Sequence, residues 1–125
     1  IVWLIHPRTK KIIEKNSIDV QFKILDPLGY LEMIFMLQKC KMVMTDSGGL
    51  QKEAFFFKKN CVTLRDETEW VELIENGFNV LVGSDSDKIE KAYLEMKSKV
   101  NNFNVNLYGN GKASIAIAEK LINEN

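Results

Sequence analysis

Five short apolar runs alternate with segments of helical periodicity, and this alternation limits the fold more than any other feature of the chain. The runs span residues 1–5, 20–25, 41–45, 61–64 and 79–82. The helical segments span residues 9–15, 30–39, 50–58, 68–76, about 85–99 and 112–123, and Ser84 or Asp85 is expected to cap the fifth of them. The segment 101–111, rich in Asn and Gly, is expected to be a loop. Strands that alternate with helices form a parallel sheet with helices on both faces. We therefore predict an α/β fold, a Rossmann-like or flavodoxin-like parallel sheet sandwiched by helices.

The length of 125 residues fits one domain with one core. The first residue, Ile1, already lies within an apolar run. We therefore expect residues 1–125 to be a single domain and a fragment of a longer chain.

Charge and cysteine content exclude several classes of partner. Seventeen basic residues balance seventeen acidic ones, so no net charge favours nucleic acid or an anionic membrane. The apolar runs are far shorter than the roughly 20 residues that a membrane span needs. Cys40 and Cys61 border apolar segments, and we expect buried free thiols and a cytoplasmic protein.

The loop after the third run carries the strongest local signal, because parallel sheets of this class bind ligands at the carboxyl ends of their strands. Asp46-Ser47-Gly48-Gly49 leaves a strand and opens a helix. The two glycines leave the first N–H groups of the helix uncovered, at the positive end of its dipole. A diphosphate can bind there with the Ser47 hydroxyl as a further donor, and Glu53 can accept both hydroxyls of a ribose. A capped helix with a glycine turn and a surface glutamate is the alternative.

Two further strand ends carry residues that could contact an anion. Arg65 follows the fourth run and suits a bidentate contact to phosphate, while Asp66 or Thr68 could cap the next helix. The alternative is a solvated arginine beside an exposed cap. His6, the only histidine, follows the first run and could be a base, a phosphate contact or an ordinary loop residue.

Other kinds of chemistry lack the residues that they require. One histidine and two separated cysteines offer no metal-ligand spacing, and neither a Walker motif nor GxGxxG occurs, so we expect no metal and no cofactor. Ser47 has no nearby partners for a Ser-His-Asp arrangement. A response-regulator receiver needs paired acids and a lysine where this chain has Ile5-His6 and Val82-Gly83.

Taken together, these loops resemble one family, the non-hydrolysing UDP-N-acetylglucosamine 2-epimerases, over nearly the whole chain. The segment 44–54, which contains Asp46-Ser47-Gly48-Gly49, closely resembles the central motif of that family. The segment 64–69 resembles the next motif at the expected spacing, and Leu81-Val82-Gly83, the segment 108–113 and His6-Pro7 resemble further ones. Several motifs in this order are far more specific than any one of them.

The resemblance implies the UDP-binding, C-terminal half of a two-domain GT-B isomerase. Such an enzyme inverts C2 of a UDP-HexNAc or UDP-HexNAcA sugar by anti elimination and re-addition of UDP, in surface polysaccharide precursor synthesis. The resemblance further implies that Ser47, Gly48 and Gly49 contact the diphosphate and that Glu53 binds the ribose. Tyr30 or a neighbour lies where the family lines its uracil pocket.

The resemblance also implies what this chain leaves to other parts of the protein. In some bacterial members, the histidine that matches His6 contacts a second, activating UDP-sugar. The catalytic acids and the catalytic histidine lie in the N-terminal domain, upstream of Ile1. We therefore expect no catalytic residue here, no activity from this chain alone, and a full-length homodimer.

The chain departs from the commonest family pattern at three places. Trp70-Val71-Glu72 stands where many members have Arg-Pro-Glu, the segment 55–60 replaces a run of small residues, and Asn110 stands where aspartate is common. The first two departures resemble the subgroup that acts on UDP-diacetamido-glucuronate or related sugars. Two alternatives remain: a GT-B glycosyltransferase domain, and a UDP-sugar sensor or interaction module without a reaction.

Overall fold

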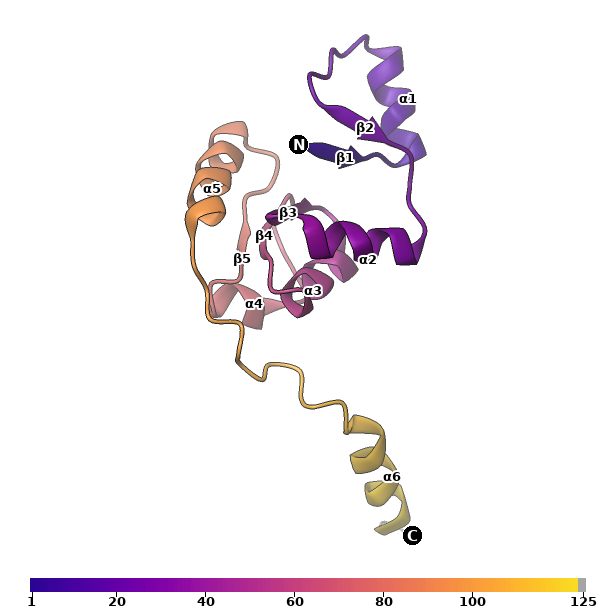
Figure 1. Ribbon diagram of the computed structural model, residues 1–125, viewed down its shortest axis with the longest axis vertical. Coiled ribbons are helices and arrows are strands. Elements are labelled where there is room, and N and C mark those ends of the chain that lie inside the picture. Colours follow the sequence, from indigo (N-terminus) through magenta and orange to yellow (C-terminus); the bar gives the residue numbers. More distant parts are fainter. Residues whose placement is uncertain (124–125) are drawn as a thin grey trace. The chain divides into compact units, whose positions relative to one another are not determined.

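The computed structural model describes residues 1–123, which divide into two compact units, Ile1–Cys40 and the chain from Lys41 onward (Figure 1). The first unit contains β1 (Val2–Leu4), α1 (Pro7–Lys15), β2 (Lys23–Leu25) and α2 (Tyr30–Lys39). β1 and β2 pair in parallel, with Trp3 opposite Ile24. Ile5 is 1% exposed, and its N–H donates to the Leu25 carbonyl over 3.0 Å, which extends the pairing beyond β1.

Both helices of the first unit begin with residues suited to that position. Pro7 opens α1, where its missing N–H costs nothing because the first N–H groups of a helix have no internal partner. The preceding His6 caps the helix, since its Nδ1 accepts the Arg8 N–H over 3.2 Å. At the start of α2, the Glu32 carboxylate accepts the Gly29 N–H over 2.8 Å.

The second unit is a three-stranded parallel sheet with its helices. It contains β3 (Met42–Thr45), α3 (Gly48–Phe56), β4 (Asn60–Thr63), α4 (Val71–Glu75), β5 (Asn79–Leu81), α5 (Ser86–Ser98) and α6 (Ala113–Asn123). The strand order is β3-β4-β5, with Val43 opposite Cys61 and Val62 opposite Val80. β4 is the central strand, and all four of its residues are buried.

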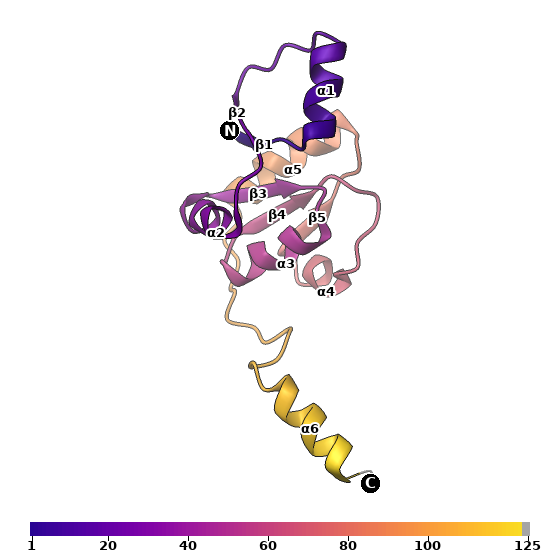
Figure 2. The ribbon, with the colours of Figure 1, turned by 90° about the vertical axis from the view of Figure 1, so that its right-hand side faces the viewer.

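Helices cover both faces of the sheet of the second unit, with α5 on one face and α3 and α4 on the other (Figure 2), and each face has an apolar cluster. On one face, α5 packs over β4 through buried residues that are all aliphatic or sulfur-containing: Val62, Val82, Ala92 and Met96. On the other face, α3 and α4 bring together Phe55, Leu73 and Phe78, with Trp70, Phe103 and Tyr108 packed around them. Burial on both faces accounts for the continuous apolar runs of these strands.

The structure confirms the predicted α/β class and its parallel pairing, with two differences. The strands are hydrogen-bonded as one pair and one group of three, whereas the periodicity predicts one sheet. The helix expected over 68–76 begins at Val71, because the Thr68 hydroxyl bonds Gln51 and the Trp70 N–H instead of capping a helix. Of the two caps expected for α5, Ser84 and Asp85, the structure has Asp85, whose carboxylate accepts the N–H groups of Asp87 and Lys88.

Cys40 and Cys61 are thiols rather than disulfide partners; Cys61 is buried, as predicted, whereas Cys40 is only half-buried, where burial was expected. Burial raises the pKa of the Cys61 thiol to about 12. No described helix has both the length and the apolar character needed to cross a membrane.

Candidate functional site

The amino end of α3 lies at the carboxyl edge of the three-stranded sheet and has the features of an anion-binding site. Ser47 is its N-cap, and the Ser47 hydroxyl lies 3.5 Å from the Leu50 nitrogen, whose N–H it accepts. The Ser47 N–H in turn donates to Thr45 Oγ1 over 3.0 Å. A Cβ added at Gly49 would meet no atom within 4 Å, so the backbone there is open to a ligand. The unpaired N–H groups and the helix dipole make this end attractive to an anion.

Arg65 and Glu69 flank this helix end from the loop after β4. The two side chains form a bidentate ion pair, with Nη2–Oε1 at 3.1 Å and Nη1–Oε2 at 3.3 Å. A Cβ at Gly48 would lie 3.2 Å from Glu69 Oε2 and 3.7 Å from Arg65 Nη1, so the pair sits directly against the Gly48 backbone. The Gly83 N–H donates to the Arg65 carbonyl over 3.1 Å and fixes the loop to the end of β5.

The carboxylates around Arg65 define the electrostatics of this edge. The hydrogen bond from Arg65 holds the pKa of Glu69 below its usual value, and Glu69 is therefore ionised at neutral pH. The pKa of Arg65 is raised, mainly by the hydrogen bond and charge of Glu69, with smaller contributions from Glu67 and Asp46. An anion that binds Arg65 must therefore replace or share an internal carboxylate.

A buried polar network connects α3 to β4 and β5. Gln51 is fully buried, and its Oε1 accepts hydrogen bonds from Thr68 Oγ1 at 2.6 Å and from Asn79 Nδ2 at 3.0 Å. Its Nε2 donates to the Ser47 carbonyl over 3.3 Å. Asn79 Oδ1 also accepts from the Thr63 hydroxyl over 2.9 Å. One amide therefore links the turn before α3 to the loop after β4 and to β5.

A second link joins the same two loops through Trp70. Its indole Nε1–H donates to the Gly48 carbonyl over 2.8 Å. The indole ring meets Tyr108 edge to face, with 5.9 Å between centroids and an interplanar angle of 89°. The Lys52 ammonium lies 4.5 Å from the Trp70 ring centroid and 4.3 Å from that of Tyr108. Burial raises the pKa of the Tyr108 hydroxyl, which stays neutral at physiological pH.

The predicted site residues fall into two groups in the structure. Ser47, Gly48 and Gly49 lie together at the start of α3 with Arg65 beside them, and Glu53 lies half-buried on the same helix. His6 and Tyr30 belong to the other unit: His6 caps α1, and Tyr30 is the first residue of α2, 67% exposed.

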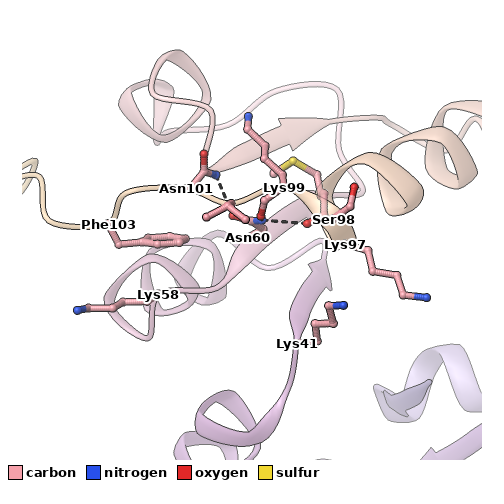
Figure 3. Close-up of a pocket in the computed structure, with 10 residues that line it drawn as sticks. Lys41, Lys58, Asn60, Lys97, Ser98, Lys99, Asn101 and Phe103 are labelled. Carbon is pink, nitrogen blue, oxygen red and sulfur yellow. Dashed lines mark hydrogen bonds between the residues drawn. The ribbon is translucent and has the colours of Figure 1, made fainter.

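A hollow of about 450 Å³ lies elsewhere on the second unit, around Asn60, the first residue of β4 (Figure 3). Its lysines, Lys41, Lys58, Lys97 and Lys99, point in different directions rather than toward one point. Lys99 Nζ donates to the Gly77 carbonyl over 2.8 Å, and Asn101 Nδ2 donates to Asn60 Oδ1 over 2.8 Å. Because β4 begins here, this hollow lies at the edge of the sheet opposite to the amino end of α3.

Sequence reasoning missed the residues that hold the site together. Gln51 could have been suspected, because it lies one helical turn after Ser47 on a helix expected to bind a ligand. The contact between Trp70 and Gly48 joins residues that are 22 positions apart, and no local sequence pattern predicts it. No group of three or more His, Cys, Asp or Glu side chains that could hold a metal occurs within residues 1–123.

Comparison with known proteins identifies the family. The family described as UDP-N-acetylglucosamine 2-epimerase matches residues 1–122, and the chain therefore belongs to this family. The UDP-2,3-diacetamido-2,3-dideoxy-D-glucuronate 2-epimerase of Pseudomonas aeruginosa is 50% identical over 121 residues, which are 97% of this chain and 34% of that protein. The UDP-N-acetylglucosamine 2-epimerase of Methanocaldococcus jannaschii is 41% identical over 127 residues, or 97% of this chain and 34% of that protein.

Solved structures agree with the family and with the fold. The Methanocaldococcus jannaschii UDP-GlcNAc 2-epimerase in complex with UDP-GlcNAc and UDP matches with a TM-score of 0.81 and 40% identity, over 98% of this chain and 35% of that one. The Neisseria meningitidis enzyme bound to UDP-GlcNAc matches with a TM-score of 0.67 and 28% identity, over 98% of this chain and 36% of that one. The present chain thus spans about a third of the length of the relatives that it matches, and its fold is that of the GT-B epimerases.

Proposed function

We propose that the full-length protein is a UDP-sugar 2-epimerase and that residues 1–125 form its UDP-binding domain. The observation that carries the proposal is the open amino end of α3, with Ser47 and Gly49 free to face an anion and Arg65 alongside. It occurs in a chain that matches the epimerase family over residues 1–122. The relatives are epimerases, which favours this function over a glycosyltransferase or a sensor without a reaction.

In this proposal the chain holds the leaving group of the reaction. The α3 N–H groups, the Ser47 hydroxyl and Arg65 bind the diphosphate, and Glu53 accepts the ribose hydroxyls. Inversion at C2 proceeds by loss of the C2 proton and anti elimination of UDP, followed by re-addition of UDP and protonation of the opposite face. Charge accumulates on the diphosphate as it departs, and fixed donors stabilise that charge at no cost of reorganisation.

Two further contacts are proposed from the family resemblance. Tyr30 contacts the uracil, and its 67% exposed side chain is available for stacking. His6 contacts a second, activating UDP-sugar, although its imidazole Nδ1 accepts the Arg8 N–H in the present structure. The sugar is a UDP-HexNAc or UDP-HexNAcA, and the 50% identity to a diacetamido-glucuronate epimerase favours the uronate.

Residues outside this chain supply the catalytic acids in the proposed mechanism. A further N-terminal domain holds them, the full-length protein is a homodimer, and the chain alone is inactive. The exposed apolar side chains of α6 support a further contact surface in the full-length protein, because Ile115 and Ile117 are 56% and 60% exposed. The absence of a disulfide between Cys40 and Cys61 is consistent with a reducing cytoplasm, where the product would serve surface polysaccharide synthesis.

Titration with UDP, UMP and uridine tests the proposal. Calorimetry on the full-length protein should show UDP binding more tightly than UMP, and UMP more tightly than uridine. In residues 1–125 alone, UDP should shift the backbone amides of Ser47 to Glu53 and of Arg65. If the chemical shifts of those amides do not change while the full-length protein binds UDP, the site needs its partner domain. Failure of the full-length protein to bind UDP would contradict the proposed function.

A further inference from the structure

We infer that Trp70 is a positioning residue for the diphosphate: its indole N–H fixes the peptide between Gly48 and Gly49 so that the Gly49 N–H faces the ligand. The inference deepens the proposed function and rests on it for the identity of the ligand. The contact itself, Nε1–H to the Gly48 carbonyl over 2.8 Å, is independent of any ligand.

The geometry of the peptide bond connects Trp70 to the binding donor. The peptide group is planar and trans, so the carbonyl of Gly48 and the N–H of Gly49 point in opposite directions. A donor that holds the Gly48 carbonyl from one side therefore sets the direction of the Gly49 N–H on the other side. A Cβ at Gly49 would meet nothing within 4 Å, which is the open side on which an anion would lie.

The turn needs such a restraint because two glycines follow each other at the start of the helix. The Gly48 carbonyl belongs to the first turn of α3, where the helix's own hydrogen bonding restrains it, but glycine has more backbone freedom than any other residue, so a donor from outside the helix adds a second restraint on the Gly48–Gly49 peptide. Ser47 restrains the turn from before, through its N–H to Thr45 Oγ1 and its hydroxyl to the Leu50 N–H. Neither of these bonds involves the peptide between the two glycines.

Trp70 is itself held in place, both at its backbone and at its ring. The Trp70 backbone N–H donates to Thr68 Oγ1 over 3.1 Å, and the same hydroxyl donates to the buried Gln51 over 2.6 Å. Tyr108 meets the ring edge to face, and the Lys52 ammonium lies 4.5 Å from its centroid. A donor with so little freedom loses little entropy when it bonds the Gly48 carbonyl.

Removal of the indole N–H alone tests the inference in the full-length protein. Trp70→Phe keeps an aromatic ring for Lys52 and Tyr108 but deletes the donor. Replacement of Trp70 by benzothienylalanine keeps the size and shape of the indole and puts sulfur where the N–H was, so it covers the case in which Trp70→Phe fails to fold. Trp3→Phe is the matched control, because Trp3 is also half-buried and also meets an aromatic ring, Phe22, at 5.9 Å.

Two readouts are needed, one with ligand and one without. Calorimetry should show that both Trp70 variants bind UDP about five- to tenfold more weakly, as expected for one lost hydrogen bond, while uridine affinity changes by less than about twofold. Hydrogen exchange of the ligand-free protein should be faster in the peptide that covers residues 46–52. Trp3→Phe should leave both measurements at their wild-type values.

The results separate this inference from the proposed function. Equal losses for UDP and uridine, or unchanged UDP affinity with unchanged exchange over residues 46–52, would overturn the role of Trp70. If the wild-type protein fails to bind UDP, the proposed function is wrong, and the exchange experiment alone then decides whether Trp70 orders the turn.

Discussion

The Thr68 hydroxyl donates a 2.6 Å hydrogen bond to Gln51 Oε1, and this contact joins the loop after β4 to the helix after β3. The same oxygen accepts from Asn79, and the amide nitrogen donates to the Ser47 carbonyl. Gln51→Leu would remove the acceptor of the Thr68 hydroxyl and of the buried Asn79 amide, and a buried donor left unsatisfied costs roughly 1–3 kcal/mol. We expect the free energy of unfolding to fall by about 2–4 kcal/mol, measured by urea denaturation.

An exposed glutamine provides the control for this prediction. Gln21 is exposed, and its side-chain hydrogen bond to Asp19 lies within the same short segment. Gln21→Leu should change the free energy of unfolding by less than about 0.5 kcal/mol. A loss of the same size in both variants would show that the Gln51 network adds nothing specific to stability.

The proposed ribose contact of Glu53 predicts a ligand-dependent loss. Glu53→Ala should weaken UDP about tenfold or more, because a carboxylate that accepts two hydroxyls makes charge-assisted hydrogen bonds. Pyrophosphate, which lacks a ribose, should bind within about twofold of wild type. Calorimetry with both ligands checks this, with Glu75→Ala, an exposed acid of α4, as the control. Equal losses for both ligands would show that Glu53 does not hold the ribose.

Removal of the Glu69 charge should raise the affinity for UDP rather than lower it. It lies 3.2 Å from a Cβ position on Gly48 and pairs with Arg65, so it competes with a diphosphate for the same cation. Its pKa is lowered by Arg65, and the competing charge is therefore present at neutral pH. Glu69→Gln should tighten UDP about three- to tenfold, and the gain should shrink as salt rises.

Glu67→Gln is the matched control, because it removes the same charge from the same loop. Glu67 contributes less to the raised pKa of Arg65 than Glu69 does. We expect UDP affinity to change by less than about twofold in this variant. Weaker UDP binding by Glu69→Gln would mean instead that Glu69 holds Arg65 in its binding position.

The order of strands and helices could be predicted from the sequence because it depends on local patterns. The apolar run of β4 and the turn at Asp46-Ser47-Gly48-Gly49 can each be recognised from a few consecutive residues. The cap at Asp85 was likewise one of two expected, because Ser and Asp accept helix N–H groups. Local chemistry therefore placed the open end of α3 at a strand end.

The parts that could not be predicted depend on contacts between residues distant in the sequence. Thr68 looks like a helix cap, yet its hydroxyl is used by Gln51, 17 residues earlier, and the helix begins at Val71. Trp70 reads as an ordinary apolar residue until its indole is placed beside Gly48. Periodicity also predicts strands but not their neighbours, so the pairing into two groups was not foreseen.

The buried thiol of Cys61 predicts a loss of stability at high pH. Burial raises its pKa from an ordinary value of 9.0 to about 12, and the side chain is 2% exposed. Between these values the unfolded chain loses the thiol proton while the folded chain keeps it. The contribution of this thiol to the free energy of unfolding is therefore fully present below pH 9 and is lost as pH rises toward 12. The slope should be about 1.4 kcal/mol per pH unit.

A comparison with Cys61→Ala isolates this contribution from the lysines and tyrosines that titrate in the same range. The variant has no thiol at this position, so the free energy of unfolding, measured in urea from pH 8 to pH 11, should fall less steeply than in wild type. The difference between the two slopes is the quantity to compare, because the cost of the lost side chain itself does not vary with pH. Parallel curves would show that the folded state also releases the proton, and hence that the Cys61 thiol is not held neutral by burial.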